Sequence, residues 1–284
     1  MPRPTVSIDL VLAGVGFRTR VLGTCPAEHV TARFGAFTGD PGERAVDLEV
    51  AVDPAWRPPH APRAVFPAAD ATRLADGRVR FVRVSDQLTY DPEGRTARGW
   101  TTGTAPGLAA VVDPTALDTP LRLLMSYELP RRGGMLVHAC GYADDRGAVL
   151  FIAPSGGGKT TTARKLPHAS VLSDDQVALR RDGAVWTAWA LPFVGEYARA
   201  IAPRSAPLRA VVLLAKAPVL DLHRVAPAQA LARVLAGTVY FLRGDPSSAA
   251  LLDLAGDLVD KVPVYTLALP REAPVAPVLD QLLR

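Results

Sequence analysis

The stretch of the chain that is best suited to chemistry is Ala153-Pro-Ser-Gly-Gly-Gly-Lys-Thr160. The apolar run 148–152 precedes it, and a segment with helical propensity follows from Thr161 onward. Strand, glycine-rich loop and helix start, in that order, are the context in which a loop binds the phosphates of a nucleotide. The glycines would let backbone N–H groups approach phosphate oxygens without a Cβ in the way, and the helix start would add further donors. The sequence therefore predicts a nucleotide-binding loop at this position.

Two residues at the end of this loop have side chains that suit specific tasks. Lys159 would reach the β- and γ-phosphates, and the hydroxyl of Thr160 would take one Mg²⁺ coordination position. Ala153 stands where the first glycine of the G-x-x-x-x-G-K-[ST] pattern usually lies, which is acceptable if that residue needs only a negative φ. The simpler alternative is a glycine-rich turn that happens to precede Lys-Thr. The residues expected to contact the nucleotide are Ser155, Gly156, Gly157, Gly158, Lys159, Thr160 and Thr161.

A pair of carboxylates, Asp174-Asp175, follows the next short apolar run, 169–172. Adjacent residues on a strand point to opposite faces, so one carboxylate would serve a metal ion and the other a hydroxyl that accepts a phosphoryl group. Such a group is needed because a phosphate-binding loop positions the donor but supplies no base. His138, on the strand that precedes the loop strand, would hold or share a proton with an acid. The alternatives are a solvated turn for the acid pair and a structural role for the histidine.

Composition excludes several classes of protein. The chain has 284 residues, of which 49% are hydrophobic, so a sizeable core is available and global disorder is excluded. The net charge of +4 comes without any block of consecutive Lys or Arg, which does not favour a nucleic-acid partner. No segment approaches eighteen consecutive apolar residues, and the two cysteines are far apart without metal-ligand spacing. We therefore expect a cytoplasmic protein with no membrane segment.

The elements that position these residues divide the chain near residue 113. Residues 1–113 predict a small, strand-rich α+β domain, and residues 114–284 alternate strands and helices, which predicts an α/β domain. A helix over 114–129 would join the two. The other strands are expected over 5–12, 16–22, 45–52, 79–84, 135–142, 148–153, 169–172, 177–180, 184–190, 208–215 and 264–269, and the other helices over 26–34, 227–241, 247–261 and 275–283.

Three segments occur in an informative order: Val137-His-Ala-Cys-Gly141, the loop 153–160, and Leu172-Ser-Asp-Asp-Gln176. In this order and at these separations they resemble the HPr kinase/phosphorylase family, whose catalytic domain has a histidine–glycine strand, a G-x-S-G-x-G-K-S loop and a double aspartate. Arg204-Ser-Ala-Pro-Leu-Arg-Ala210 is also similar to smaller HPr-kinase-like proteins, including kinases of lasso-peptide precursors. The resemblance covers roughly residues 133–270. It implies that the α/β domain is a P-loop nucleotide-binding domain of the HPr kinase/PEP-carboxykinase-like type.

The resemblance also implies roles for individual residues. Asp174 corresponds to the general base that acts on the acceptor hydroxyl, and His138 corresponds to the histidine that supports it. Asp175 would lie beside the metal ion or the acceptor, and Glu196 corresponds loosely to an acid near the metal. The implied metal ligands are thus Thr160, Asp175 and Glu196, and the implied cofactors are ATP and Mg²⁺.

The leading hypothesis is an ATP- and Mg²⁺-dependent kinase that phosphorylates a serine-type hydroxyl. Its partners would be a protein, peptide or small-molecule acceptor and a possible homo-oligomer, with no nucleic acid and no membrane. One alternative is a non-catalytic regulatory or scaffold protein that binds a nucleotide, although binding alone would not demand both Asp174 and His138. The other is a phosphoenolpyruvate-carboxykinase-like enzyme, for which the chain is too short to hold the large domains.

Overall fold

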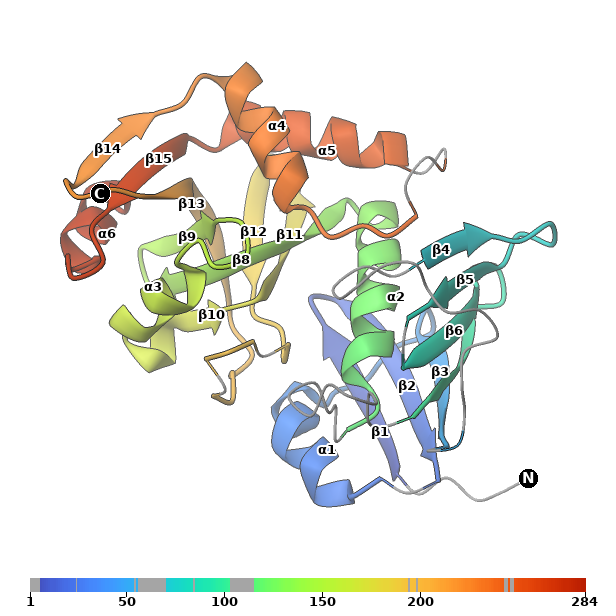
Figure 1. Cartoon of the computed structure of the whole chain (residues 1–284). Coiled ribbons are helices and arrows are strands. Elements are labelled where there is room, and N and C mark those ends of the chain that lie inside the picture. The colour runs from blue at the N-terminus through green and yellow to red at the C-terminus, as the bar shows by residue number, and fades with distance from the viewer. Residues whose placement is uncertain are drawn as a thin grey trace. The chain divides into compact units, whose positions relative to one another are not determined.

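The chain divides into two compact units. The computed structural model describes residues 6–23, 25–53, 55, 70–83, 85–102, 115–193, 195–197, 199–242, 245 and 248–284. Unit 1 comprises Met1–Glu128 and Tyr240–Asp245, and unit 2 comprises Leu129–Val239 and Pro246–Arg284. Within the described residues each unit contains one sheet, and six α-helices accompany the two sheets (Figure 1). The predicted α/β class is thereby confirmed at this level, while the boundary predicted near residue 113 lies outside the described residues.

Unit 1 is built on a seven-stranded sheet with the order β1-β2-β3-β7-β6-β5-β4. The predicted first hairpin is confirmed, because Leu10 pairs with Phe17 and the turn residues Ala13 and Gly14 have φ of 48° and 76°. Strands β2, β3 and β7 pair in parallel, and the remaining pairs are antiparallel. The strands are β1 (Val6–Leu12), β2 (Val15–Leu22), β3 (Val46–Val52), β4 (Asp70–Arg73), β5 (Val79–Val82), β6 (Asp86–Asp91) and β7 (Thr96–Thr101).

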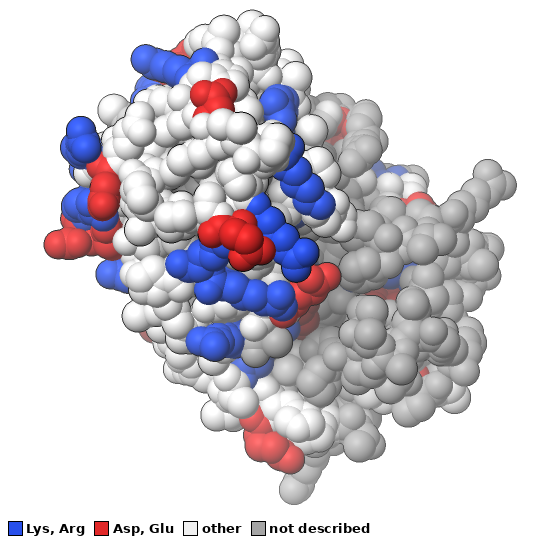
Figure 2. Space-filling view, turned by 60° about the vertical axis from the view of Figure 1, so that its left-hand side comes forward, with Lys and Arg blue, Asp and Glu red and all other residues white. Residues whose placement is uncertain are grey.

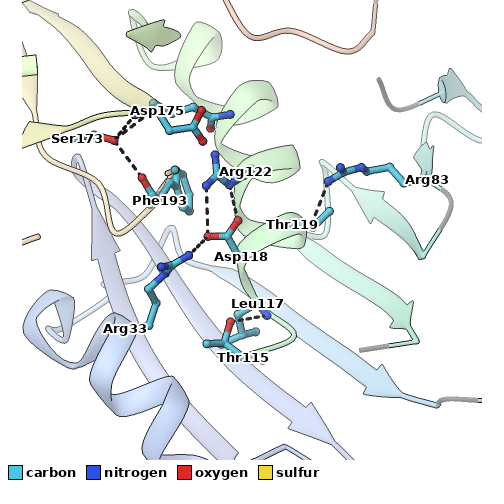
Figure 3. Close-up of polar contacts among 12 residues, drawn as sticks. Arg33, Arg83, Thr115, Leu117, Asp118, Thr119, Arg122, Ser173, Asp175 and Phe193 are labelled. Atoms are coloured by element: carbon cyan, nitrogen blue, oxygen red, sulfur yellow. Dashed lines mark hydrogen bonds and ion pairs between the residues drawn. The ribbon is translucent and has the colours of Figure 1, made fainter. Parts of the chain in front are cut away.

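Two helices of unit 1 are joined by polar contacts. Helix α1 (Ala27–Phe34) is followed by a short 3-10 turn, η1 (Gly35–Phe37), and helix α2 spans Asp118–Arg131. Arg33 of α1 donates to Asp118 at the start of α2 over 3.0 Å, and Arg122 contacts the same carboxylate one turn further along (Figure 3). The buried Glu128 of α2 accepts a 2.7 Å hydrogen bond from the hydroxyl of Tyr90 on β6.

Unit 2 carries an eight-stranded sheet in which parallel strands occupy the centre. Strand β13, which contains the predicted central segment 208–215, pairs in parallel with β9 on one side and with β15 on the other. Strand β8 pairs with β9, β10 and β11, all antiparallel. The strands are β8 (Gly134–Asp144), β9 (Gly147–Ile152), β10 (Val171–Ser173), β11 (Gln176–Asp182), β12 (Val185–Trp189), β13 (Ser205–Lys216), β14 (Asp221–Arg224) and β15 (Val264–Leu269).

Helices accompany this sheet, and α4 and α5 lie against each other and against β8 (Figure 1). The helix predicted over 227–241 ends at Gly237, because Thr238 and Val239 pair with β8 instead of continuing the helix. In the described part of the chain, no helix is long and apolar enough to cross a membrane. The helices are α3 (Lys159–Lys165), η2 (His168–Ser170), α4 (Pro227–Gly237), α5 (Ser248–Lys261) and α6 (Ala276–Leu282).

Candidate functional site

The predicted phosphate-binding loop connects β9 to α3, as the sequence pattern indicates. Gly156 and Gly158 have φ of 70° and 107°, which only glycine adopts at low cost, and a Cβ at either position would meet no atom within 4 Å. The loop is therefore open on the side of these two residues. Lys159 is 7% exposed, and its ammonium donates to the backbone oxygens of Ala153 at 2.8 Å and Pro154 at 3.1 Å. The lysine thus lies folded over the loop that precedes it.

Ala153 fits in place of the usual first glycine because its backbone does not need a positive φ and because Gly157 leaves room for its methyl group. Among the described residues that are not glycine, positive φ occurs at Ala13, Arg95 and Ala116, so Ala153 does not need the conformational freedom of glycine. A Cβ added to Gly157 would lie only 2.7 Å from the methyl group of Ala153, which is too close for two carbon atoms. The absence of a side chain at Gly157 therefore makes room for the extra methyl group.

Acidic groups surround the buried ammonium of Lys159. Burial lowers the pKa of this lysine, and the negative charge of Asp175 is the first of the acidic influences that oppose the shift. Asp174 and Glu196 act on the pKa in the same direction. The lysine therefore lies within electrostatic reach of all three acids that the sequence singled out. The side chain of Glu196 is exposed, as are Ser155 and Thr161 in and after the loop.

Asp174 is held in place by backbone N–H groups from a distant segment. It is only 3% exposed, and its two carboxylate oxygens accept hydrogen bonds from the N–H groups of Gly195 at 3.0 Å and Tyr197 at 2.8 Å. The hydroxyl of Thr160 lies 3.5 Å from one of these oxygens. A Cβ on Gly195 would lie 3.0 Å from both Asp174 Oδ2 and Asp175 Cβ, so the backbone packs closely on the acid pair.

Asp175 is paired with His138. His138 Nδ1 lies 3.4 Å from Asp175 Oδ1, and the two side chains are 37% and 22% exposed. The histidine also pairs across the β8–β11 ladder with Gln176, whose buried amide oxygen has no hydrogen-bond partner among the described residues. The accessible carboxylate of the pair is therefore the one beside the histidine, while the other carboxylate is buried beside Thr160.

The turn that carries both acids is fixed by Ser173. Its hydroxyl donates to the backbone oxygen of Phe193 at 3.0 Å and accepts from the N–H groups of Asp175 and Gln176, both at 3.1 Å (Figure 3). Ser173 and Phe193 are both fully buried. This side chain thus ties the acid pair to the segment that also supplies the N–H donors for Asp174.

Two side chains at this site offer the kind of oxygen ligands that Mg²⁺ prefers. Among the described residues, no group of three or more His, Cys, Asp or Glu side chains could hold a metal ion. The Thr160 hydroxyl and the Asp174 carboxylate offer two oxygens 3.5 Å apart. Mg²⁺ commonly takes one or two protein oxygens and completes its shell with substrate phosphates and water. Thr160 and Asp174 would hold such an ion beside the loop.

Sequence reasoning missed four residues that shape this site: Ser173, Gly195, Tyr197 and Cys140. Three of them act through backbone groups or a hydroxyl that fixes a turn, and such roles leave no local pattern in the sequence. From the sequence, Cys140 is only one of two cysteines without metal-ligand spacing and a member of the segment that bears His138. It is fully buried, and its burial raises the pKa of the thiol, as does the nearby charge of Asp174.

The state of Cys140 gives a testable prediction. A raised pKa keeps the thiol neutral at pH 8, and only the thiolate reacts rapidly with alkylating reagents. We expect iodoacetamide to leave both cysteines unmodified in the folded protein, because Cys25 is buried as well, and to label both after denaturation. Mass spectrometry after timed labelling measures this. Rapid labelling of Cys140 in the folded protein would contradict the buried, neutral thiol.

Comparison with known families adds one finding. The family model described as SynChlorMet cassette protein ScmC matches residues 121–283, which is more than half of the chain. The match includes the loop, the acid pair, His138 and the segment around Gly195. No curated protein matches the chain.

Proposed function

We propose that this chain, which belongs to the ScmC family of SynChlorMet cassette proteins, is a kinase that transfers phosphate from ATP to a serine-type hydroxyl. The acceptor would be a protein, a peptide or a small molecule. The proposal includes the finer fold assignment, a P-loop domain of the HPr kinase/PEP-carboxykinase-like type. It rests on the resemblance in the three ordered segments together with the contacts at the site.

One observation carries the proposal: a buried lysine, a threonine hydroxyl and two carboxylates converge at the ends of β9 and β10. Lys159 lies within the electrostatic influence of both Asp174 and Asp175. Thr160 lies 3.5 Å from Asp174, and Asp175 lies 3.4 Å from His138. A protein that only binds a nucleotide needs Lys159 and Thr160. It has no need of an accessible carboxylate that is paired with a histidine.

The side-chain contacts favour a division of labour between the two acids. Asp174 already accepts two backbone hydrogen bonds and lies beside Thr160, which suits a carboxylate that helps to hold the metal ion. Asp175 is more exposed and paired with His138, which suits a carboxylate that takes a proton from an incoming hydroxyl. From the resemblance, the base was expected at Asp174 with His138 behind it. We now assign the base to Asp175, because the histidine contacts that residue.

In the proposed reaction the acceptor oxygen forms a bond to the γ-phosphorus while the bond between that phosphorus and the bridging oxygen of ADP breaks. The hydroxyl proton passes to Asp175, and His138 orients that carboxylate. Lys159, whose ammonium lies over the loop, would contact the phosphates, and the open loop around Gly156 and Gly158 would receive their oxygens. Mg²⁺, when bound, would neutralise phosphate charge and fix the geometry of the phosphates.

Acceptor-dependent ADP formation tests this function. The protein is incubated with ATP and Mg²⁺ and a degenerate library of end-blocked peptides that contain one serine, and a matched library has alanine at that position. We expect ADP to form faster with the serine library, because only its members offer the hydroxyl. Equal ADP formation with both libraries would contradict a serine peptide as the acceptor. Absence of ADP formation with either library, in a protein that binds ATP–Mg²⁺, would favour a nucleotide-binding scaffold.

A further inference from the structure

A cavity of about 290 Å³ lies at the end of α3. The described residues that line it are Arg164, Leu166, His168, Tyr197 and Arg199. Leu166 and Tyr197 are buried, whereas the two arginines and the histidine are exposed. The cavity therefore combines an apolar and aromatic base with a cationic opening. Figure 2 brings forward the side of the molecule where α3 and α6 lie, and it shows Lys and Arg side chains gathered beside Asp and Glu.

The polar groups that line this cavity contact one another or the nearby backbone. The guanidinium of Arg199 lies over the ring of Tyr197, 5.5 Å from its centroid, in cation–π geometry. The hydroxyl of Tyr197 lies 3.2 Å from His168 Nδ1. Arg164 donates one long hydrogen bond, 3.5 Å, to the backbone oxygen of Glu196. Because a guanidinium has five N–H donors, both arginines retain donors that can bind a ligand.

These donors favour an anionic ligand. Arginine matches the two oxygens of a carboxylate in a planar, bidentate arrangement, and it accepts no hydrogen bonds. None of the described residues that line the cavity is acidic. A nucleobase such as adenine carries no negative charge, so it would leave the two guanidinium groups without a charge partner. The cavity therefore suits an anion better than it suits the base of the nucleotide.

The cavity is directly linked to the acid pair. Tyr197 lines the cavity with its side chain, and its backbone N–H donates to Asp174 over 2.8 Å. Gly195, two residues earlier, donates to the other oxygen of the same carboxylate. One short segment therefore both forms a wall of the cavity and holds an acid of the candidate catalytic site. A ligand in the cavity would lie beside the segment that holds Asp174.

We propose that this cavity selects the acceptor by binding a carboxylate that it carries, namely an acidic side chain close to the phosphorylated serine in a peptide. Arg164 and Arg199 are the residues that recognise the carboxylate, and Tyr197 couples the occupied cavity to Asp174. The proposal rests on the proposed kinase function for the identity of the ligand. It does not depend on that function for the binding itself, so the two can fail separately.

Peptide binding and turnover test the proposal with one double variant. End-blocked peptides carry one serine and a single Asp that is moved through the neighbouring positions, and the matched peptides carry Asn instead. Fluorescence anisotropy measures binding, and labelled ATP measures transfer. For the parent we expect a preference for Asp of about 10- to 100-fold at one position, since a hydrogen-bonded charge pair carries such an effect. In Arg164→Gln/Arg199→Gln the preference should vanish while the KM for ATP stays unchanged.

The control is Arg271→Gln, which removes the same charge from a side chain that is 89% exposed and outside the cavity. It should keep the full preference for Asp. A parent without any Asp preference, or a preference that survives in the double variant, would overturn the proposal. A raised KM for ATP in the double variant with unchanged peptide affinity would assign the cavity to the nucleotide and would also overturn it. Peptide binding with the expected preference but without transfer would instead overturn the proposed kinase function and leave the cavity assignment standing.

Discussion

Replacing Asp175 with asparagine should lower the rate of phosphoryl transfer by roughly 10² to 10⁴, the usual contribution of a general base, while ATP–Mg²⁺ binding is retained. Asparagine keeps the size of the side chain but cannot accept the proton of the acceptor hydroxyl. His138→Ala should produce a smaller loss, because the histidine orients the carboxylate at a distance of 3.4 Å and does not take the proton itself. Initial rates with labelled ATP and calorimetry with ATP–Mg²⁺ measure the two properties separately.

The companion variant Asp174→Asn should behave differently. An amide at this position would still contact Thr160 but would bind Mg²⁺ poorly, so the Mg²⁺ concentration needed for half-maximal rate should rise. Asp145→Asn, which removes an exposed carboxylate from the β8–β9 turn, serves as the matched control. It should leave the rate of transfer and its Mg²⁺ dependence unchanged. Full activity in Asp175→Asn together with loss of transfer in Asp174→Asn at saturating Mg²⁺ would return the role of base to Asp174.

Replacing Lys159 with alanine should weaken ATP–Mg²⁺ binding by about 10- to 150-fold, because a charge-assisted hydrogen bond in a partly buried site contributes about 1.5–3 kcal/mol. Lys216→Ala removes the same charge from an exposed position at the end of β13 and should bind ATP like the parent. Lys159→Met, which keeps the length of the side chain, separates the loss of charge from a disturbance of the loop. Unchanged affinity in both Lys159 variants would exclude the loop as the nucleotide site.

The same lysine predicts a pH dependence. Burial lowers the pKa of Lys159, and binding of phosphate requires its charged form. As the pH rises, the affinity of the parent for ATP should therefore begin to fall at a lower pH than it would for an exposed lysine. Calorimetric titrations across the alkaline range measure this. The fall should be absent in Lys159→Met, in which no charge is left to lose.

Much of the fold could be predicted from local patterns. The strand over 264–269 is observed at those residues, and the hairpin across Asp182-Gly183 forms because Gly183 adopts a φ of 58° there. Strand β14 was not predicted, because Asp221–Arg224 is short, polar and at the edge of the sheet, where no apolar alternation is required. The alternation of apolar and polar residues indicates which face of a strand is buried. A four-residue strand at the edge of a sheet is too short to show such an alternation.

The candidate site was predicted in its parts but not in its pairings. The motif spacing indicated that Lys159 and Thr160 would lie near the Asp174-Asp175 pair, and the contacts bring them together. The pairing of His138 with Asp175 could not be read from the spacing, because it depends on the turn after β10, which the Ser173 hydroxyl fixes by accepting two backbone hydrogen bonds. The return of Gly195 to Asp174 depends on backbone N–H groups, which every residue except proline has and which therefore leave no signature.

Identification of the product is the most direct test of whether this site transfers a phosphoryl group to a serine hydroxyl. The serine peptide library is incubated with the parent, ATP and Mg²⁺, and fragmentation mass spectrometry locates any added phosphate. We predict one phosphoryl group on the serine side chain in the parent reaction, and a yield near background with Asp175→Asn, although that variant still binds ATP. A parent that binds ATP–Mg²⁺ tightly but leaves every serine unmodified would contradict the claim.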